Sequence, residues 1–132
     1  MGVRCLTFGS EIMEILIVSH SEAIAKGVKA LLEQMAQDVV VKVTGGINGE
    51  IGTSIDDIMQ MFDSVEGEAL CFYDIGSSKM NIEMALEMKN YSNIHIAHYP
   101  IVEGAFLASV ESKIGKGYKE ILESLSNNFK EK

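Results

Sequence analysis

One histidine stands at the end of a strongly apolar segment near the start of the chain. The segment Ile15 to Val18 is typical of a strand buried on both faces of a sheet, and Ser19, His20 and Ser21 follow it. A helical pattern begins next, so we expect His20 at a strand-to-helix turn, close to unpaired backbone N–H groups that bind anions. A neutral imidazole there is a nucleophile near neutral pH. A cap or a polar loop is the simpler interpretation of a lone histidine.

Asp74 is a candidate partner for His20. It follows another apolar segment, Glu68 to Tyr73, and lies beside His20 if the two strands are neighbours in the sheet. A carboxylate there accepts a hydrogen bond from one ring nitrogen, fixes the tautomer and leaves the other nitrogen as the nucleophile. The alternative role is a cap for the helix that begins near Ser77, and one aspartate can serve both purposes.

The segment from Gly45 to Thr53 contains four glycines, whose backbone N–H groups can approach an anion closely. Thr53 and Ser54 add hydroxyl groups. The segment has no Gly-Lys-Ser or Gly-Lys-Thr and no GxGxxG with a following acidic residue, so the sequence disfavours nucleotide binding by this chain. A mobile surface loop is the simpler interpretation of the glycine content alone.

Two further patterns have structural explanations. His95 and His98 lie near the end of a predicted strand but lack cysteine or carboxylate partners at metal-ligand spacing, so we expect no metal site. Met80, Met84 and Met88 follow the i, i+4 spacing of one helical face. Core packing is the simplest interpretation of this methionine stripe, although such faces also suit partner docking.

Strand and helix patterns alternate along the chain. The predicted strands are 15–18, 39–43, 68–73 and 94–97, and the predicted helices are 22–35, 54–65, 77–89, 102–114 and 118–128. The alternation predicts an α/β fold with a mostly parallel central sheet of about four strands and helices on both faces. Ligands bind such sheets at the carboxyl ends of the strands, so the loops that follow the four strands should converge there.

The length of 132 residues and the 47% hydrophobic content fit one globular domain, which we place at 13–128. Residues 1–12 show no clean period and are expected to be an extension or a cloning remnant. An extra edge strand through 3–8 is the alternative. Residues 129–132 are expected to form a solvated tail.

Charge and cysteine content exclude several classes of partner. With 11 basic and 19 acidic residues, the net charge of −8 argues against nucleic acid and anionic membranes and favours a cationic protein partner. The chain has two cysteines, Cys5 and Cys71, and no apolar stretch of the roughly 20 residues that cross a bilayer. We therefore expect reduced cysteines and a cytoplasmic protein.

Four segments together resemble one protein family. They are ILIVSHS at 15–21, GGINGEIGTS at 45–54, YDIGSS at 73–78 and YPIVEGA at 99–105. They resemble the phosphotransfer subunit of bacterial phosphoenolpyruvate-dependent dihydroxyacetone kinase, whose fold relative is the mannose-type enzyme IIA of the sugar phosphotransferase system. The resemblance covers 13–128, and its motifs fall in the loops that the sheet topology selects.

The resemblance implies a phosphoryl relay. The histidine phosphocarrier protein phosphorylates His20, and His20 passes the group to ADP on the nucleotide-binding subunit of the kinase, which works with a dihydroxyacetone-binding subunit. Asp74 orients the ring. The residues implied to bind the phosphoryl group are Ser21, Gly52, Thr53, Gly76, Ser77 and Ser78. The chain then needs no metal or bound cofactor of its own, ADP and magnesium belong to the partner subunit, and a homodimer that acts only with its partners is expected.

Two other functions stay open. A mannose-type enzyme IIA that feeds a sugar permease keeps the His20 chemistry but changes the acceptor, and neighbouring genes would distinguish it. A non-catalytic module of flavodoxin-like shape would hold a small anion on the glycine-rich loop and form no covalent adduct. The sequence fixes neither the oligomeric state nor the ring nitrogen that is phosphorylated.

Overall fold

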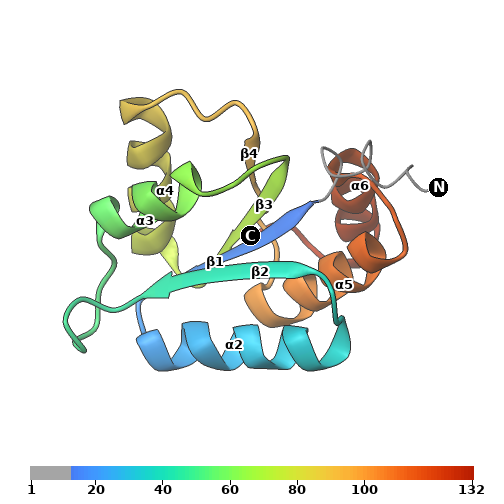
Figure 1. The fold of residues 1–132 in the computed structure, drawn as a ribbon, viewed down its shortest axis with the longest axis horizontal. Helices are drawn as coiled ribbons and strands as arrows, with labels where there is room; N and C mark the ends of the chain where they lie inside the picture. Colours follow the sequence, from blue (N-terminus) through green and yellow to red (C-terminus); the bar gives the residue numbers. More distant parts are fainter. Residues whose placement is uncertain (1–12) are drawn as a thin grey trace.

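The computed structural model describes residues 13–132, which form a four-stranded parallel sheet with helices on both faces (Figure 1). The strands are β1 (Glu14–Ser19), β2 (Val40–Gly45), β3 (Ala69–Tyr73) and β4 (Ile94–Ile96). The helices are α2 (Glu22–Met35), α3 (Ile55–Asp63), α4 (Gly76–Met88), α5 (Ile101–Lys113) and α6 (Tyr118–Asn128). The predicted α/β fold is confirmed. The extension and the edge strand predicted within 1–12 lie outside the described residues.

The central strand β1 is buried along its whole length. Ile15 and Ile17 pack into the core on one face of the sheet, and Leu16 and Val18 pack into the core on the other. Each such side chain contributes about 1.5–3 kcal/mol when fully buried. The continuous apolar run therefore has a physical cause, since this strand has no solvated face.

Two helical layers cover the sheet. The first core is built on α2, α5 and α6 with Leu32 and Leu125, and the second on α3 and α4 with Phe62 and Ile82, all fully buried or nearly so. Figure 1 shows α2 and α5 together on one side of the sheet and α3 and α4 on the other. Each helix thus buries one apolar stripe against the strands, as amphipathic helices require.

The order of the strands is β2-β1-β3-β4. β2 therefore lies on one side of β1, whereas β3 and β4 lie on the other side. This reversal makes the gap between the carboxyl ends of β1 and β3 the topological switch point, where open α/β sheets bind ligands. Val18 is paired with Tyr73 in the parallel register. Residues that follow these two strands therefore leave the sheet at the same edge.

The end of β2 lies against the turn that follows β1. The strand extends to Gly45, beyond its predicted end at Val43, because Gly45 still pairs with Ser19 through the backbone. A Cβ atom at Gly45 would lie 2.7 Å from the carbonyl oxygen of Ser21 and 2.9 Å from that of Ser19. The two backbones approach each other too closely here for a side chain, so the first position of the loop requires glycine.

We expect Gly45→Ala to push the Ser19–Ser21 turn away from β2 and to lower the free energy of unfolding by about 1–3 kcal/mol. The matched control is Gly27→Ala in α2, where an added Cβ would meet no atom within 4 Å. That change should stabilise the protein by about 0.5–1 kcal/mol, because alanine is the better helix former. Urea denaturation measures both, and equal effects of the two variants would contradict the assigned contact.

Candidate functional site

Asp74 lies beside His20 at the switch point of the sheet. Nδ1 of His20 is 3.0 Å from Oδ1 of Asp74, and the backbone N–H of His20 donates to Oδ2 at 3.0 Å. Their side chains are 14% and 15% exposed. The predicted adjacency of the two residues is confirmed, and it follows from the direct pairing of β1 with β3.

The carboxylate of Asp74 accepts three further hydrogen bonds. The hydroxyls of Ser19 and Ser78 donate to it at 2.7 and 2.8 Å, and the backbone N–H of Ile75 donates at 2.7 Å. Burial raises the pKa of Asp74, but the hydrogen bonds outweigh burial and lower the pKa to about 2. The alternative role as a helix cap is wrong, because α4 has Ile75 as its N-cap residue and no side chain caps it.

The charge on Asp74 determines the tautomer of His20. An ionised carboxylate can only accept hydrogen bonds, so Nδ1 must carry the proton that bridges the two side chains. In the neutral ring the lone pair is then on Nε2, which faces the hydroxyl of Ser77. Within residues 13–132, the N–H groups of Gly76 and Ser77 at the start of α4 have no recorded hydrogen-bond partner. Free N–H groups at a helix N-terminus bind anions.

Two of the residues predicted to bind the phosphoryl group, Ser21 and Gly52, support the turn that holds His20. Ser21 caps α2 by accepting the N–H of Ile24 at 3.2 Å, and its own N–H donates to the Ser19 hydroxyl at 3.1 Å. The N–H of Gly52 donates to the carbonyl of His20 at 2.8 Å. Their backbone N–H groups are therefore engaged within the protein, although both residues adjoin the histidine.

Ser78 and Thr53 are also engaged. Ser78 is buried and lies on the Nδ1 side of the ring, where its hydroxyl donates to Asp74, so it sits away from Nε2. The hydroxyl of Thr53 accepts a hydrogen bond from the amide of Asn81 in α4. Sequence reasoning missed Asn81, although its position four residues after Ser77 places both on one helical face.

Residues 14–122 match the protein-family model described as "PTS system fructose IIA component". The chain belongs to this family. Phosphotransferase subunit DhaM of the PTS-dependent dihydroxyacetone kinase of Lactococcus lactis is 38% identical over 120 residues, which cover 89% of this chain and 97% of that protein. Phosphoryl donor subunit DhaM of kinase 1 of Listeria innocua is 38% identical over 99 residues, 74% of this chain and 79% of that protein. The resemblance found in the four motifs is confirmed.

Two solved structures share the fold. A crystal structure of a protein of unknown function superposes with a TM-score of 0.81 at 29% identity and covers 91% of this chain and 96% of its own. The phosphotransferase system component EIIA from Streptococcus agalactiae gives a TM-score of 0.65 at 16% identity, covering 87% and 90%. At that identity the second likeness shows the fold alone.

The other histidines of this IIA domain belong to separate groups. Nε2 of His95 is 2.6 Å from Oε1 of Glu68, and the ring stacks on Tyr118 at 3.9 Å. Nδ1 of His98 is 2.9 Å from the hydroxyl of Tyr73. In the described residues, no three His, Cys, Asp or Glu side chains are grouped so that they could hold a metal ion.

The surface differs from the expectation at α4. Met80, Met84 and Met88 are 64%, 45% and 64% exposed, so the interpretation as core packing is wrong.

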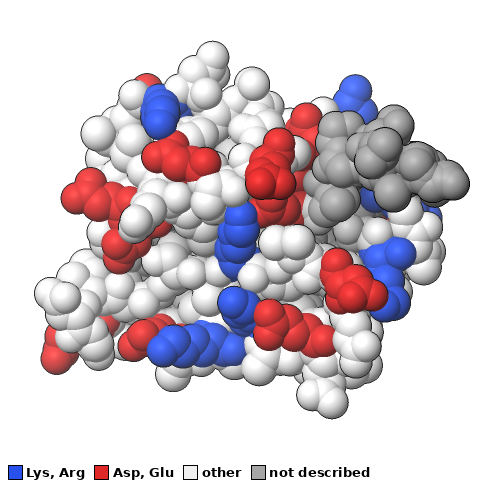
Figure 2. Space-filling view, viewed as in Figure 1, with Lys and Arg blue, Asp and Glu red and all other residues white. Residues whose placement is uncertain are grey.

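Figure 2 shows acidic and basic side chains interspersed on the face it presents, without a continuous positive patch. Among residues 13–132, no helix has the length and apolar character needed to cross a membrane.

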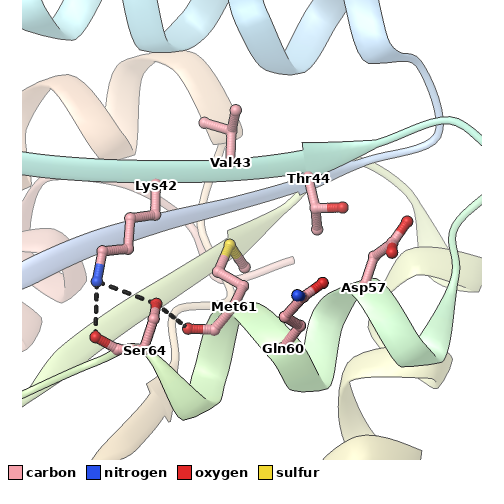
Figure 3. A pocket seen from close by; sticks show the side chains of 7 residues that line it. All are labelled: Lys42, Val43, Thr44, Asp57, Gln60, Met61 and Ser64. Atoms are coloured by element: carbon pink, nitrogen blue, oxygen red, sulfur yellow. Dashed lines mark hydrogen bonds between the residues drawn. The ribbon is translucent and has the colours of Figure 1, made fainter.

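A groove of about 380 Å³ lies between β2 and α3 (Figure 3). It is lined by Lys42, Val43, Thr44, Asp57, Gln60, Met61 and Ser64. Its cation is already engaged: Lys42 donates to the Ser64 carbonyl at 2.8 Å and pairs with Glu14 at 2.8 Å. Neither His20 nor Asp74 lines the groove, so it is separate from the site in this IIA domain.

The low pKa of Asp74 predicts an acid-dependent contribution to stability. Because the pKa is depressed from 3.8 to about 2 in the folded state, the stabilisation is present above about pH 4 and is lost as the pH falls towards 2. Urea denaturation should show that the wild type is more stable than Asp74→Asn at pH 7 and that the gap closes over this window. A gap that does not change with pH would contradict the assigned hydrogen bonds.

Proposed function

We propose that this chain is a phosphohistidine carrier, the phosphoryl donor subunit of a dihydroxyacetone kinase. It accepts a phosphoryl group on His20 from the histidine phosphocarrier protein and passes it to ADP on the nucleotide-binding subunit. The observation that supports this most is the His20–Asp74 pair, which leaves Nε2 as the nucleophile at the switch point. The DhaM relatives from Lactococcus lactis and Listeria innocua support the choice of acceptor.

In the loading step the lone pair of Nε2 forms a bond to phosphorus. The N–P bond of the donor histidine breaks, and its electron pair returns to the donor ring. The His20 ring becomes a cation that keeps its proton on Nδ1, and the Asp74 carboxylate at 3.0 Å stabilises this cation. The reaction passes through a loose state with charge on the equatorial oxygens, so positioned donors contribute most of the catalysis.

The donors closest to that charge are at the start of α4. The Ser77 hydroxyl faces Nε2, and the free N–H groups of Gly76 and Ser77 lie at the positive end of the helix dipole. We infer that these groups bind the phosphoryl oxygens. No metal of this chain enters the reaction, and ADP with its magnesium belongs to the partner subunit.

In the unloading step an oxygen of the ADP β-phosphate forms the new bond to phosphorus. The bond between phosphorus and Nε2 breaks, and its electron pair returns to the ring of His20. The chain is thus regenerated unchanged and acts only with its partners. We infer that it works in the cytoplasm as a homodimer and that it serves glycerol metabolism through dihydroxyacetone.

Exposed apolar side chains next to the site support a protein partner. Ile51 precedes Gly52, whose backbone N–H donates to the carbonyl of His20, and Ile75 follows Asp74. The side chains of Ile51 and Ile75 are 74% and 57% exposed. Met80, three residues after Ser77 on α4, is also exposed, and such apolar surface near a site suits burial against another protein. A small soluble substrate would leave this surface in water.

The two alternatives have less support. A mannose-type IIA that feeds a sugar permease keeps the same chemistry, but the relatives at 38% identity are dihydroxyacetone kinase subunits. A non-catalytic anion-binding module has no use for a histidine whose tautomer is fixed by an ionised carboxylate.

We expect the purified chain to gain one phosphoryl group when it is incubated with phosphoenolpyruvate, enzyme I and the histidine phosphocarrier protein. The group should be acid-labile and base-stable, as expected for an N–P bond, and intact mass measures it. It should be absent in His20→Ala and present in the control His95→Gln, because His95 lies in a separate group. Asp74→Asn should slow loading by about 10–100-fold.

The acceptor is tested by adding ADP with the kinase subunits to the phosphorylated chain. Loss of the group with formation of ATP supports the proposal. Discharge by a sugar permease, but not by the kinase subunits, supports the alternative acceptor. An adduct that persists in His20→Ala contradicts the assignment of His20.

A further inference from the structure

The side chain of Lys132 contacts the backbone from which Asp74 extends. Its ammonium group donates to the carbonyl oxygens of Tyr73 and Asp74 at 2.8 and 2.9 Å. The same group lies 4.3 Å from the centre of the Tyr73 ring, and the backbone N–H of Lys132 donates to the carbonyl of His98 at 2.8 Å. Figure 1 marks the C-terminus beside β3. Lys132 is nevertheless exposed, so these hydrogen bonds attach the predicted solvated tail at 129–132 to the protein without burying its last residue, whereas Phe129 packs against the first core.

Lys132 places a positive charge next to the site. Among residues 13–132, the recorded hydrogen bonds and ion pairs of the other lysine side chains reach no residue of the site. Burial lowers the pKa of Lys132, and the Asp74 charge opposes this change. The ammonium group of Lys132 and the carboxylate of Asp74 therefore attract each other.

We propose that Lys132 is a positioning residue for phosphoryl transfer, which fixes the Tyr73–Asp74 peptide so that the Asp74 carboxylate meets Nδ1 of His20. The proposal rests on the function proposed above. The carboxylate of Asp74 accepts hydrogen bonds from Ser19 on β1 and Ser78 in α4, while Lys132 donates to its backbone carbonyl. Both ends of one residue are thus restrained.

The position of this peptide matters because the ring must meet the incoming phosphorus in line. A misplacement of about 1 Å can slow an enzymatic reaction by about 100-fold. The ammonium also offsets negative charge, because a phosphoryl group on Nε2 adds charge close to an ionised carboxylate. Like charges at such a site disfavour each other, and a neighbouring cation reduces the repulsion.

The test compares Lys132→Met with Lys130→Met. Both lysines are exposed and both changes remove one positive charge, but only Lys132 has side-chain hydrogen bonds within the described residues. Two quantities are measured: the rate constant of His20 loading at saturating phosphocarrier protein, and the tautomer of the His20 ring in the unphosphorylated protein, by nitrogen-15 NMR.

We expect Lys132→Met to slow loading by about 10-fold and to increase the fraction of the ring protonated on Nε2. Lys130→Met should behave as the wild type. Lys132→Arg should restore most of the rate, because a guanidinium can also donate to two carbonyl oxygens. A wild-type loading rate and tautomer in Lys132→Met would overturn the proposal.

Failure of the proposed function gives a different result. If the wild-type chain gains no phosphoryl group, the carrier function is wrong. The tautomer measurement needs no phosphorylation, so it still decides whether Lys132 positions the pair. An unchanged His20 tautomer in Lys132→Met, with normal loading of the wild type, contradicts only the role of Lys132.

Discussion

The site depends on one hydrogen bond, between Nδ1 of His20 and the carboxylate of Asp74. It requires an ionised carboxylate in a partly buried place, and four other hydrogen bonds to the oxygens of Asp74 favour the ionised form. It also requires β1 and β3 to be neighbours, which the strand order provides. The close approach of Gly45 and the hydrogen bond from Gly52 then hold the histidine turn in place. Much of the local architecture thus serves the orientation of one ring.

This arrangement supplies, from the chain's own residues, the groups that the proposed phosphoryl transfer needs. The nucleophile and the carboxylate that orients it come from one crevice, and the anion-binding groups come from the first turn of a helix. Such groups need no rearrangement when charge develops on the phosphoryl oxygens, which is the main source of electrostatic catalysis. A partner supplies the rest, and the exposed apolar residues beside the site give it a surface to bury.

His20 and Asp74 could be predicted from the sequence because each follows an apolar run, and the carboxyl ends of parallel strands share an edge. The roles of Ser78 and Met84 could not. Both residues lie on α4. A pattern with a period of four is the same whether that face of the helix is buried or exposed, so only the packing of α4 on the sheet decides which residues are buried. Lys132 gave no signal, because its contacts join residues almost sixty positions apart.

The central claim is that Asp74 holds the proton on Nδ1 and leaves Nε2 to form the bond to phosphorus. The most direct test labels the histidines with nitrogen-15, phosphorylates the protein and identifies the bonded nitrogen from its coupling to phosphorus-31. The structure predicts coupling to Nε2 of His20, with Nδ1 still carrying its proton. Coupling to Nδ1 would contradict the account, because that nitrogen cannot bind phosphorus and Asp74 at once.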